Sequence, residues 1–323
     1  MDRHDISMTI GVARRPSVMA LIDGTVKPEG IDLTCSYKFP EPSTINRHDA
    51  ILEGKLDGGE CSTAFFVEAK VNNGAPLQAI PVFPYRSFRH RSIYCGDWAG
   101  IKTPADLKGK KVGVHMYAAS TMTWVRGLLR DEYGVRPQDI NWYTIRDDGS
   151  EGARKAGVSI EVIAPPARDV GYNQYIAQLV VGKELHVAVG PVNVVQPGLS
   201  RLFPNFAEVE SAYYRRTGIF PIIHTTVINE RIVRDHPWVP RNLLEAYRKA
   251  AELTPHYAAD PSRLESGDRE VWEVDRLILG EDSPYEWVLG PKQRHTIEAF
   301  LDYLMTDGVI ARKPTVESLF ARV

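Results

Sequence analysis

Residues 103–134 read TPADLKGKKVGVHMYAASTMTWVRGLLRDEYG, and they give the clearest indication of how this chain folds. Residues 111–114 predict a short buried strand. Apolar residues at three-to-four spacing from Met122 onward predict a helix, which Gly134 ends. A strand followed at once by a helix that covers it is the repeating unit of a largely parallel sheet. This stretch therefore indicates an α/β protein.

The same alternation continues on both sides of this stretch, up to about residue 235. We expect further strands at 8–12, 31–36, 60–64, 77–83, 141–145, 160–163 and 186–189, and helices at 17–22, 49–56 and 173–181. The last third changes character, with amphipathic helices predicted at 239–258, 269–279 and 291–305. These helices either cover the domain formed by the start of the chain or form the interface of a homo-oligomer.

Length and composition limit the classes of protein to which the chain can belong. Its 323 residues are long for one domain and natural for two. A net charge of -2 argues against a nucleic-acid partner, and no window of 18 apolar residues predicts a membrane span. The first 16 residues lack the apolar core of a secretory leader, and the three cysteines show no CxxC spacing. We therefore expect a cytoplasmic protein.

Two stretches combine basic and aromatic residues. Residues 84–94 read PYRSFRHRSIY and follow an apolar run, while residues 213–228 read YYRRTGIFPIIHTTVI. Arginine can clamp a carboxylate with two parallel hydrogen bonds, so we expect a site for a small, planar, multiply charged acid. The candidate substrate-binding arginines are Arg86, Arg89, Arg126 and Arg216. A solvated surface position is the alternative for each of them.

Four residues are candidates for proton transfer: His90, His224, His115 and Glu60. Each histidine borders an apolar or aromatic segment, and Glu60 follows Gly58 and Gly59 at the start of a short strand. The alternatives are a buried core histidine and a solvated carboxylate.

Other polar and aromatic residues could complete a substrate site. Ser120 and Thr121 precede the marked helix, whose free N–H groups can bind an anion, although ordinary helix capping explains them equally well. Aromatic side chains that could stack on a planar ring are Tyr85, Tyr117, Tyr213 and Trp124, although a core position is favoured for Trp124.

We expect no cofactor. The chain contains neither GxGxxG nor GxxxxGK[ST], so a nucleotide is not indicated. The candidate histidines and Glu60 are suitable ligands for a divalent metal, but no HxH, HxxxH or HExxH spacing marks them. A catalytic metal held by residues from distant loops is the alternative.

Four segments, residues 21–34, 79–94, 113–135 and 202–228, resemble the 4,5-dihydroxyphthalate decarboxylase family. They read LIDGTVKPEGIDLT, AIPVFPYRSFRHRSIY, GVHMYAASTMTWVRGLLRDEYGV and LFPNFAEVESAYYRRTGIFPIIHTTVI, and the likeness extends over about residues 8–237. The resemblance implies a type II periplasmic-binding-protein-like fold that works as a cytoplasmic enzyme.

The resemblance also implies an organisation and a function. Lobe 1 would comprise residues 1–95 and 215–323, and lobe 2 residues 96–214, with a ligand cleft at the hinge where the two basic stretches meet. The implied activity is cofactor-independent decarboxylation of a hydroxylated aromatic acid such as 4,5-dihydroxyphthalate. Protonation of the ipso carbon and loss of CO2 would give 3,4-dihydroxybenzoate. Two alternatives remain: a solute-binding protein for an aromatic acid, and other chemistry on a related acid.

Overall fold

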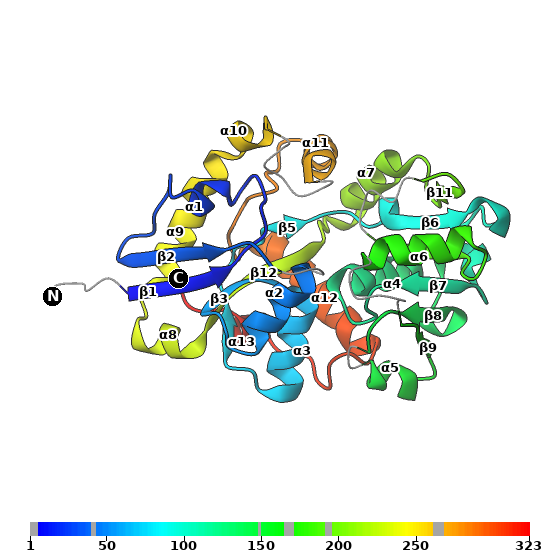
Figure 1. Cartoon of the computed structure of the whole chain (residues 1–323), viewed down its shortest axis with the longest axis horizontal. Coiled ribbons are helices and arrows are strands. Elements are labelled where there is room, and N and C mark those ends of the chain that lie inside the picture. Colours follow the sequence, from blue (N-terminus) through cyan, green and yellow to red (C-terminus); the bar gives the residue numbers. More distant parts are fainter. Residues whose placement is uncertain (1–5, 40–42, 148–149, 165–170, 191–195, 261–267) are drawn as a thin grey trace. The chain divides into compact units, whose positions relative to one another are not determined.

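The computed structural model describes residues 6–39, 43–147, 150–164, 171–190, 196–260 and 268–323. The chain forms two compact units, each built on its own six-stranded sheet (Figure 1). Unit 1 comprises Met1–Arg86, Ile222–His295 and Pro314–Val323, and unit 2 comprises Ser87–Pro221 and Thr296–Lys313.

The sheet of unit 1 has the strand order β2-β1-β3-β12-β4, and β5 also pairs with β12. These strands are β1 (Ile6–Gly11), β2 (Ile31–Ser36), β3 (Gly58–Ser62), β4 (Leu77–Ala79), β5 (Tyr85–Arg86) and β12 (Ile222–Asn229). The first three strands run parallel, whereas β12 is antiparallel to β3, β4 and β5. The late strand β12 therefore lies inside a sheet made from the first 86 residues.

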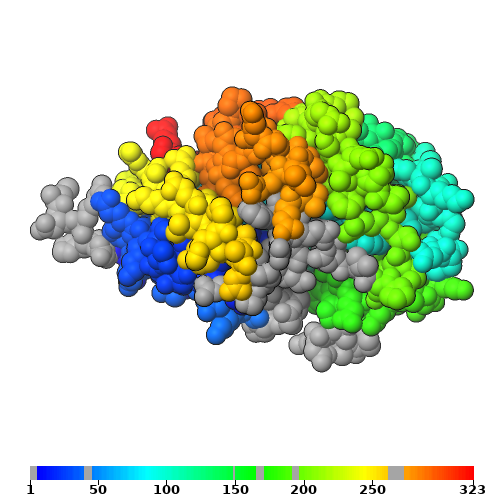
Figure 2. All heavy atoms as spheres, turned by 90° about the horizontal axis from the view of Figure 1, so that it is seen from above, coloured from blue at the N-terminus to red at the C-terminus, as the bar shows by residue number. Residues whose placement is uncertain are grey.

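Helices cover both faces of this sheet, with α2 and α3 on one side and α1 and α9 on the other (Figure 1). Those that lie wholly in unit 1 are α1 (Met19–Ile22), α2 (Ser43–Leu52), α3 (Thr63–Asn73), α8 (Glu230–Asp235), α9 (Val239–Glu252), α10 (Thr254–Ala258), α11 (Asp268–Leu279) and α13 (Val316–Leu319). In Figure 2, α9 and α10 (yellow) lie beside the N-terminal elements (blue). Asn242 donates to the carbonyl of Glu29 at 2.9 Å, and the Tyr257 hydroxyl donates to Asp23 at 2.6 Å.

Gly58 and Gly59 let β3 fit between its two neighbours. A Cβ at Gly58 would lie 2.2 Å from the carbonyl oxygen of Val227, and one at Gly59 would lie 2.1 Å from the carbonyl oxygen of Gly11. Gly59 also has a φ of +133°, which side-chain-bearing residues rarely adopt. The strand expected at residues 60–64 begins two residues earlier, with the glycine pair, and ends at Ser62.

We expect Gly59→Ala to destabilise the protein by about 3 kcal/mol or more, because backbone strain and a backbone clash add. Gly54→Ala is the matched control. Gly54 also has a positive φ (72°), but among the described residues no atom lies within 4 Å of the position that a Cβ would take there. Urea unfolding of both variants measures the difference. Equal midpoints for the two would contradict the close approach of β1 and β3.

The sheet of unit 2 has the strand order β11-β6-β10-β7-β8-β9. These strands are β6 (Ile93–Gly96), β7 (Lys111–Val114), β8 (Asn141–Thr144), β9 (Ser159–Val162), β10 (Val187–Val189) and β11 (Leu199–Arg201). Strands β10, β7, β8 and β9 are parallel, and β6 is antiparallel to β10 and β11. The parallel core is the arrangement that the strand–helix alternation predicts.

The helices that lie wholly in unit 2 are α4 (Ser120–Tyr133), α5 (Glu151–Lys155), α6 (Tyr172–Val181) and α7 (Phe206–Thr217), with short 3-10 turns at His90–Ser92, Asp97–Ala99, Pro104–Leu107 and Pro137–Asp139. Val125 of α4 packs in one apolar cluster with Val112 and Val114 of β7 and Trp142 of β8. The strand and the helix predicted from residues 103–134 are thus confirmed.

The chain passes from one unit to the other at different points from those expected. The expected lobe boundary between residues 95 and 96 falls within β6, an internal strand of the sheet of unit 2, and the change of unit falls at Arg86–Ser87. The second change falls at Pro221–Ile222, and α12 (Pro291–Thr306) begins in unit 1 and continues in unit 2. In the part of the chain that the structure describes, no helix is both long enough and apolar enough to cross a membrane.

Candidate active site

The register of unit 1 brings Glu60 and His224 together. Glu60 on β3 pairs directly with Thr226 on β12, so His224, two residues away, is its diagonal neighbour on the same face. His224 Nδ1 lies 2.5 Å from Glu60 Oε1. The glutamate side chain is fully buried and that of the histidine is 8% exposed. The two candidates that the sequence places 164 residues apart are therefore in contact.

Two buried arginines complete the surroundings of the Glu60 carboxylate. Arg15 Nε donates to Oε1 at 2.9 Å, and the backbone N–H of Ala13 donates to Oε2 at 3.1 Å. Arg47 lies 3.6 Å from Oε1 and also donates to the Glu60 backbone carbonyl at 3.3 Å. A buried carboxylate is tolerated when it is paired and hydrogen-bonded in this way.

Burial and the neighbouring charges set the protonation states of Glu60 and His224. Burial alone would raise the pKa of Glu60, but Arg15, Arg47 and His224 together hold that pKa well below its usual value. Burial lowers the pKa of His224 to about 4, against the opposing effect of Glu60. At neutral pH, Glu60 is ionised and His224 is neutral. Because the carboxylate can only accept, Nδ1 carries the proton and Nε2 keeps a lone pair.

Two further rings lie against His224. The ring of His48, on α2, is 5.0 Å from the His224 ring at an interplanar angle of 88°, and that of Tyr85, on β5, is 5.3 Å away. The Arg15 guanidinium lies 4.1 Å above the Tyr85 ring. Arg15, Arg47 and His48 were not predicted from the sequence. The Arg47–His48 pair repeats the pattern at residues 89–90, but residues 294–295 carry it too, so the pattern alone is not selective.

His90 lies in unit 2, inside a group of aromatic rings. The rings of Phe203 and Tyr213 are each 5.3 Å from it, and that of Tyr133 is 6.5 Å away. Among the described residues, neither ring nitrogen has a hydrogen-bond partner. Burial, and then the charges of Arg91 and Arg216, lower the pKa of His90 to about 3. These surroundings are typical of a core histidine, and its catalytic role stays a prediction.

His90→Phe should make stability less dependent on pH. Unfolding returns the pKa of His90 from about 3 to about 6.5, so below about pH 6.5 the unfolded chain binds a proton that the folded chain does not. Stability therefore falls with falling pH, by about 1.4 kcal/mol per unit for this group. The variant should lose less stability than the wild type between about pH 6.5 and about pH 4.5 in urea unfolding. An unchanged slope would contradict the buried, neutral state.

Arg126 contacts other residues of unit 2. Its Nε lies 2.6 Å from Asp307 at the end of α12, a second nitrogen donates to the Tyr117 carbonyl at 2.5 Å, and its guanidinium is 3.8 Å from the centre of the Tyr117 ring. These contacts join α4 to the last turn of α12. They favour a structural role for Arg126 and Tyr117 over a substrate clamp.

The other three candidate arginines differ in how exposed they are and in what they contact. Arg86 is half-buried on β5 and pairs with Ile222, and Arg89 is buried, with Nε 3.1 Å from the Ser87 carbonyl. Arg216 is 55% exposed and pairs with Glu132.

Three more candidates flank the end of β7 in unit 2. Ser120 and Thr121, expected to precede the helix, are the first two residues of α4. His115 is half-buried, and its backbone carbonyl accepts a hydrogen bond from Ile145. The roles of these residues, and the meeting of the two basic stretches at one site, stay predictions.

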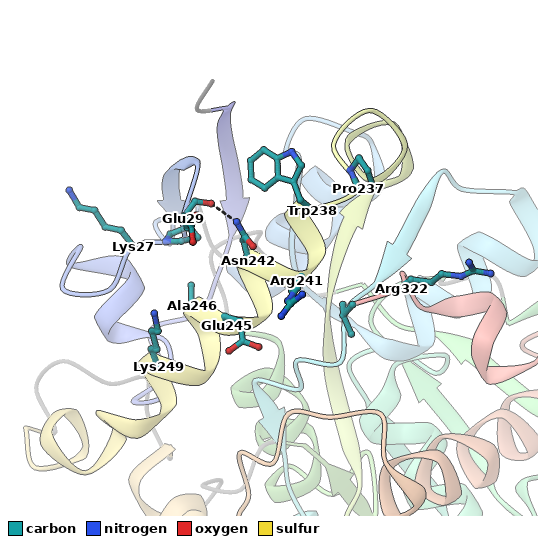
Figure 3. A pocket seen from close by; sticks show the side chains of 12 residues that line it. Lys27, Glu29, Pro237, Trp238, Arg241, Asn242, Glu245, Ala246, Lys249 and Arg322 are labelled. Carbon is teal, nitrogen blue, oxygen red and sulfur yellow. Dashed lines mark hydrogen bonds between the residues drawn. The ribbon is translucent and has the colours of Figure 1, made fainter. Parts of the chain in front are cut away.

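A surface pocket of about 690 Å³ lies elsewhere on unit 1 (Figure 3). It is bounded by α9, the turn at residues 27–29 and the segment 322–323, and it contains none of the predicted site residues. Within the described residues, no group of three or more histidine, cysteine, aspartate or glutamate side chains is arranged to hold a metal ion.

Two bacterial decarboxylases are similar in sequence to this chain. A 4,5-dihydroxyphthalate decarboxylase of Comamonas testosteroni is 29% identical over 332 residues, covering 98% of this chain and 96% of its own. One of Pseudomonas putida is 28% identical over 189 residues, covering 58% of this chain and 71% of its own. No family model matches the chain.

Solved structures share the fold. The periplasmic aliphatic sulphonate binding protein SsuA of Escherichia coli superposes with a TM-score of 0.58 at 14% identity, covering 98% of this chain and 97% of its own. The chain therefore has a periplasmic-binding-protein-like fold. Its predicted resemblance to the 4,5-dihydroxyphthalate decarboxylases is confirmed, and with the Comamonas testosteroni protein it extends beyond the expected residues 8–237 to 98% of the chain.

Proposed function

We propose that this protein is a carboxy-lyase that converts a hydroxylated aromatic dicarboxylic acid, such as 4,5-dihydroxyphthalate, into 3,4-dihydroxybenzoate and CO2. The observation that carries the proposal is the buried contact between Glu60 and His224, in a chain similar from end to end to a decarboxylase of that substrate. The surrounding arginines hold this contact in the ionised-carboxylate, neutral-imidazole form.

The reaction requires one base and one acid. In 4,5-dihydroxyphthalate each carboxylate has a hydroxyl group para to it. A base removes the proton of that hydroxyl, and the electron density released lets the carbon that bears the carboxylate accept a proton. The bond to the carboxylate then breaks, CO2 leaves, and the bond electrons restore the aromatic ring. Replacement of a carboxylate by hydrogen consumes one proton in each turnover.

His224 is suited to be the base. Its Nε2 carries a lone pair at neutral pH, because Nδ1 donates its proton to Glu60. When Nε2 takes up the hydroxyl proton, the adjacent Glu60 carboxylate stabilises the imidazolium that forms. Arg15 and Arg47 act as positioning residues, since they keep Glu60 ionised.

Turnover assays test the proposal directly. The protein is incubated with 4,5-dihydroxyphthalate while CO2 release and 3,4-dihydroxybenzoate formation are followed together. We expect both products in equal amounts. Saturable binding of the acid without turnover would overturn the proposal and support the alternative, a solute-binding protein.

We also propose that the reaction needs no cofactor. The electrons of the broken bond stay in the ring, so no redox group is required, and the base and the charges that orient it are protein side chains. Dialysis against a chelator should therefore leave kcat unchanged. A loss of activity that an added divalent metal restores would contradict this.

A further inference from the structure

We infer that His48 is the proton donor to the ring carbon, an assignment that rests on the proposed decarboxylation. The reaction consumes one proton in each turnover, so the site needs an acid as well as a base. Glu60 is ionised, and His224 donates one N–H to Glu60 while its Nε2 holds the hydroxyl proton, at the position para to the carbon that is protonated. A third group near His224 is therefore needed to supply the proton to that carbon.

His48 is placed to do this. Its ring meets that of His224 at 5.0 Å, nearly at a right angle, and the side chain is almost completely buried. The ring of Phe65, on α3, packs against it at 5.8 Å and 73°. Contacts with rings from two other elements fix the orientation of this imidazole beside the base.

The backbone around His48 is anchored to the Glu60–His224 pair. The preceding residue, Arg47, contacts both the carboxylate and the backbone carbonyl of Glu60. Arg47 also crosses Gly11 of β1, where a Cβ would lie 2.9 Å from Arg47 Cγ. Helix α2 is therefore held against β1 and β3 by the same arginine that keeps Glu60 ionised.

Tyr85 is the competing donor, because its ring lies 5.3 Å from His224. The chemistry of the two groups favours His48. It takes up a proton from solvent in each turnover and delivers it as an imidazolium, which is a far stronger acid than a phenol.

The test compares three variants with the wild type on 4,5-dihydroxyphthalate. His48→Gln keeps a polar side chain but cannot transfer a proton, so kcat should fall about 10²–10⁴-fold while KM changes little. Tyr85→Phe should keep most of the activity. Phe65→Leu keeps the imidazole and removes the ring packed on it, so its kcat should fall far less than that of His48→Gln. Binding of 3,4-dihydroxybenzoate to each variant shows that the site is intact.

The outcomes separate this inference from the proposed function. Wild-type protein that binds the acid without turnover overturns both. An active wild type with a His48→Gln variant of near-normal kcat overturns the inference alone, and a large loss in Tyr85→Phe would then assign the donor to Tyr85. If His48→Gln fails to fold, His48→Asn replaces it, because its amide nitrogen corresponds to Nδ1 of the imidazole. A loss of kcat with KM and product binding preserved supports His48.

Discussion

His224→Gln is expected to lower kcat for 4,5-dihydroxyphthalate by about 10²–10⁴-fold, the usual contribution of a general base. The amide keeps much of the size of the imidazole but cannot take up a proton. The base is lost while the sheet is kept, so KM should change much less than kcat. Steady-state kinetics at saturating substrate measure the effect.

His256→Gln is the matched control, because His256 is an exposed histidine on α10 of the same unit. It should keep wild-type kcat. A His224→Gln variant with kcat within about threefold of the wild type would remove His224 from the mechanism.

Glu60→Gln is expected to lower stability by about 3–5 kcal/mol, since removing one member of a buried ion pair leaves the other uncompensated. Here two buried guanidinium groups, those of Arg15 and Arg47, lose their carboxylate. Activity should also fall, because a neutral amide cannot stabilise the imidazolium that His224 forms. Urea unfolding and kcat are measured on the same preparation.

Glu53→Gln supplies the comparison for stability. Glu53 also forms an ion pair, with Lys55 at 2.5 Å, but both side chains are more than half exposed. Solvent screens such a pair, so its loss should hardly move the unfolding midpoint. If Glu60→Gln and Glu53→Gln are equally stable, the buried cluster does not stabilise the fold in the way described.

Local sequence patterns were sufficient to predict much of the fold. The strands at 31–36 and 111–114 were predicted with their observed bounds. Helix α3 was missed, and it shows where periodicity fails. Its first residue, Thr63, is followed by the continuous apolar run Ala64–Phe65–Phe66–Val67, and such a run does not distinguish a helix from a buried strand.

The candidate site depends on contacts that no local pattern contains. The sequence predicted Glu60 and His224 as candidates for proton transfer from their residue types and neighbours. Only the antiparallel register of β3 and β12 shows that they lie side by side. Arg15, Arg47 and His48 come from a loop and a helix that carry no distinctive motif. For Arg126, a distant partner argues against the role that the sequence predicted. Its partner, Asp307, is 181 residues away, so the sequence alone could not distinguish a buried ion pair from a ligand clamp.

The protonation state of His224 at neutral pH is the point on which the proposed chemistry most depends. Nitrogen-15 NMR of histidine-labelled protein, assigned with the His224→Gln variant, reports it directly. We predict a neutral ring with its proton on Nδ1 and a pKa of about 4. A cationic ring at neutral pH, or a neutral ring protonated on Nε2, would contradict the assignment of His224 as the base.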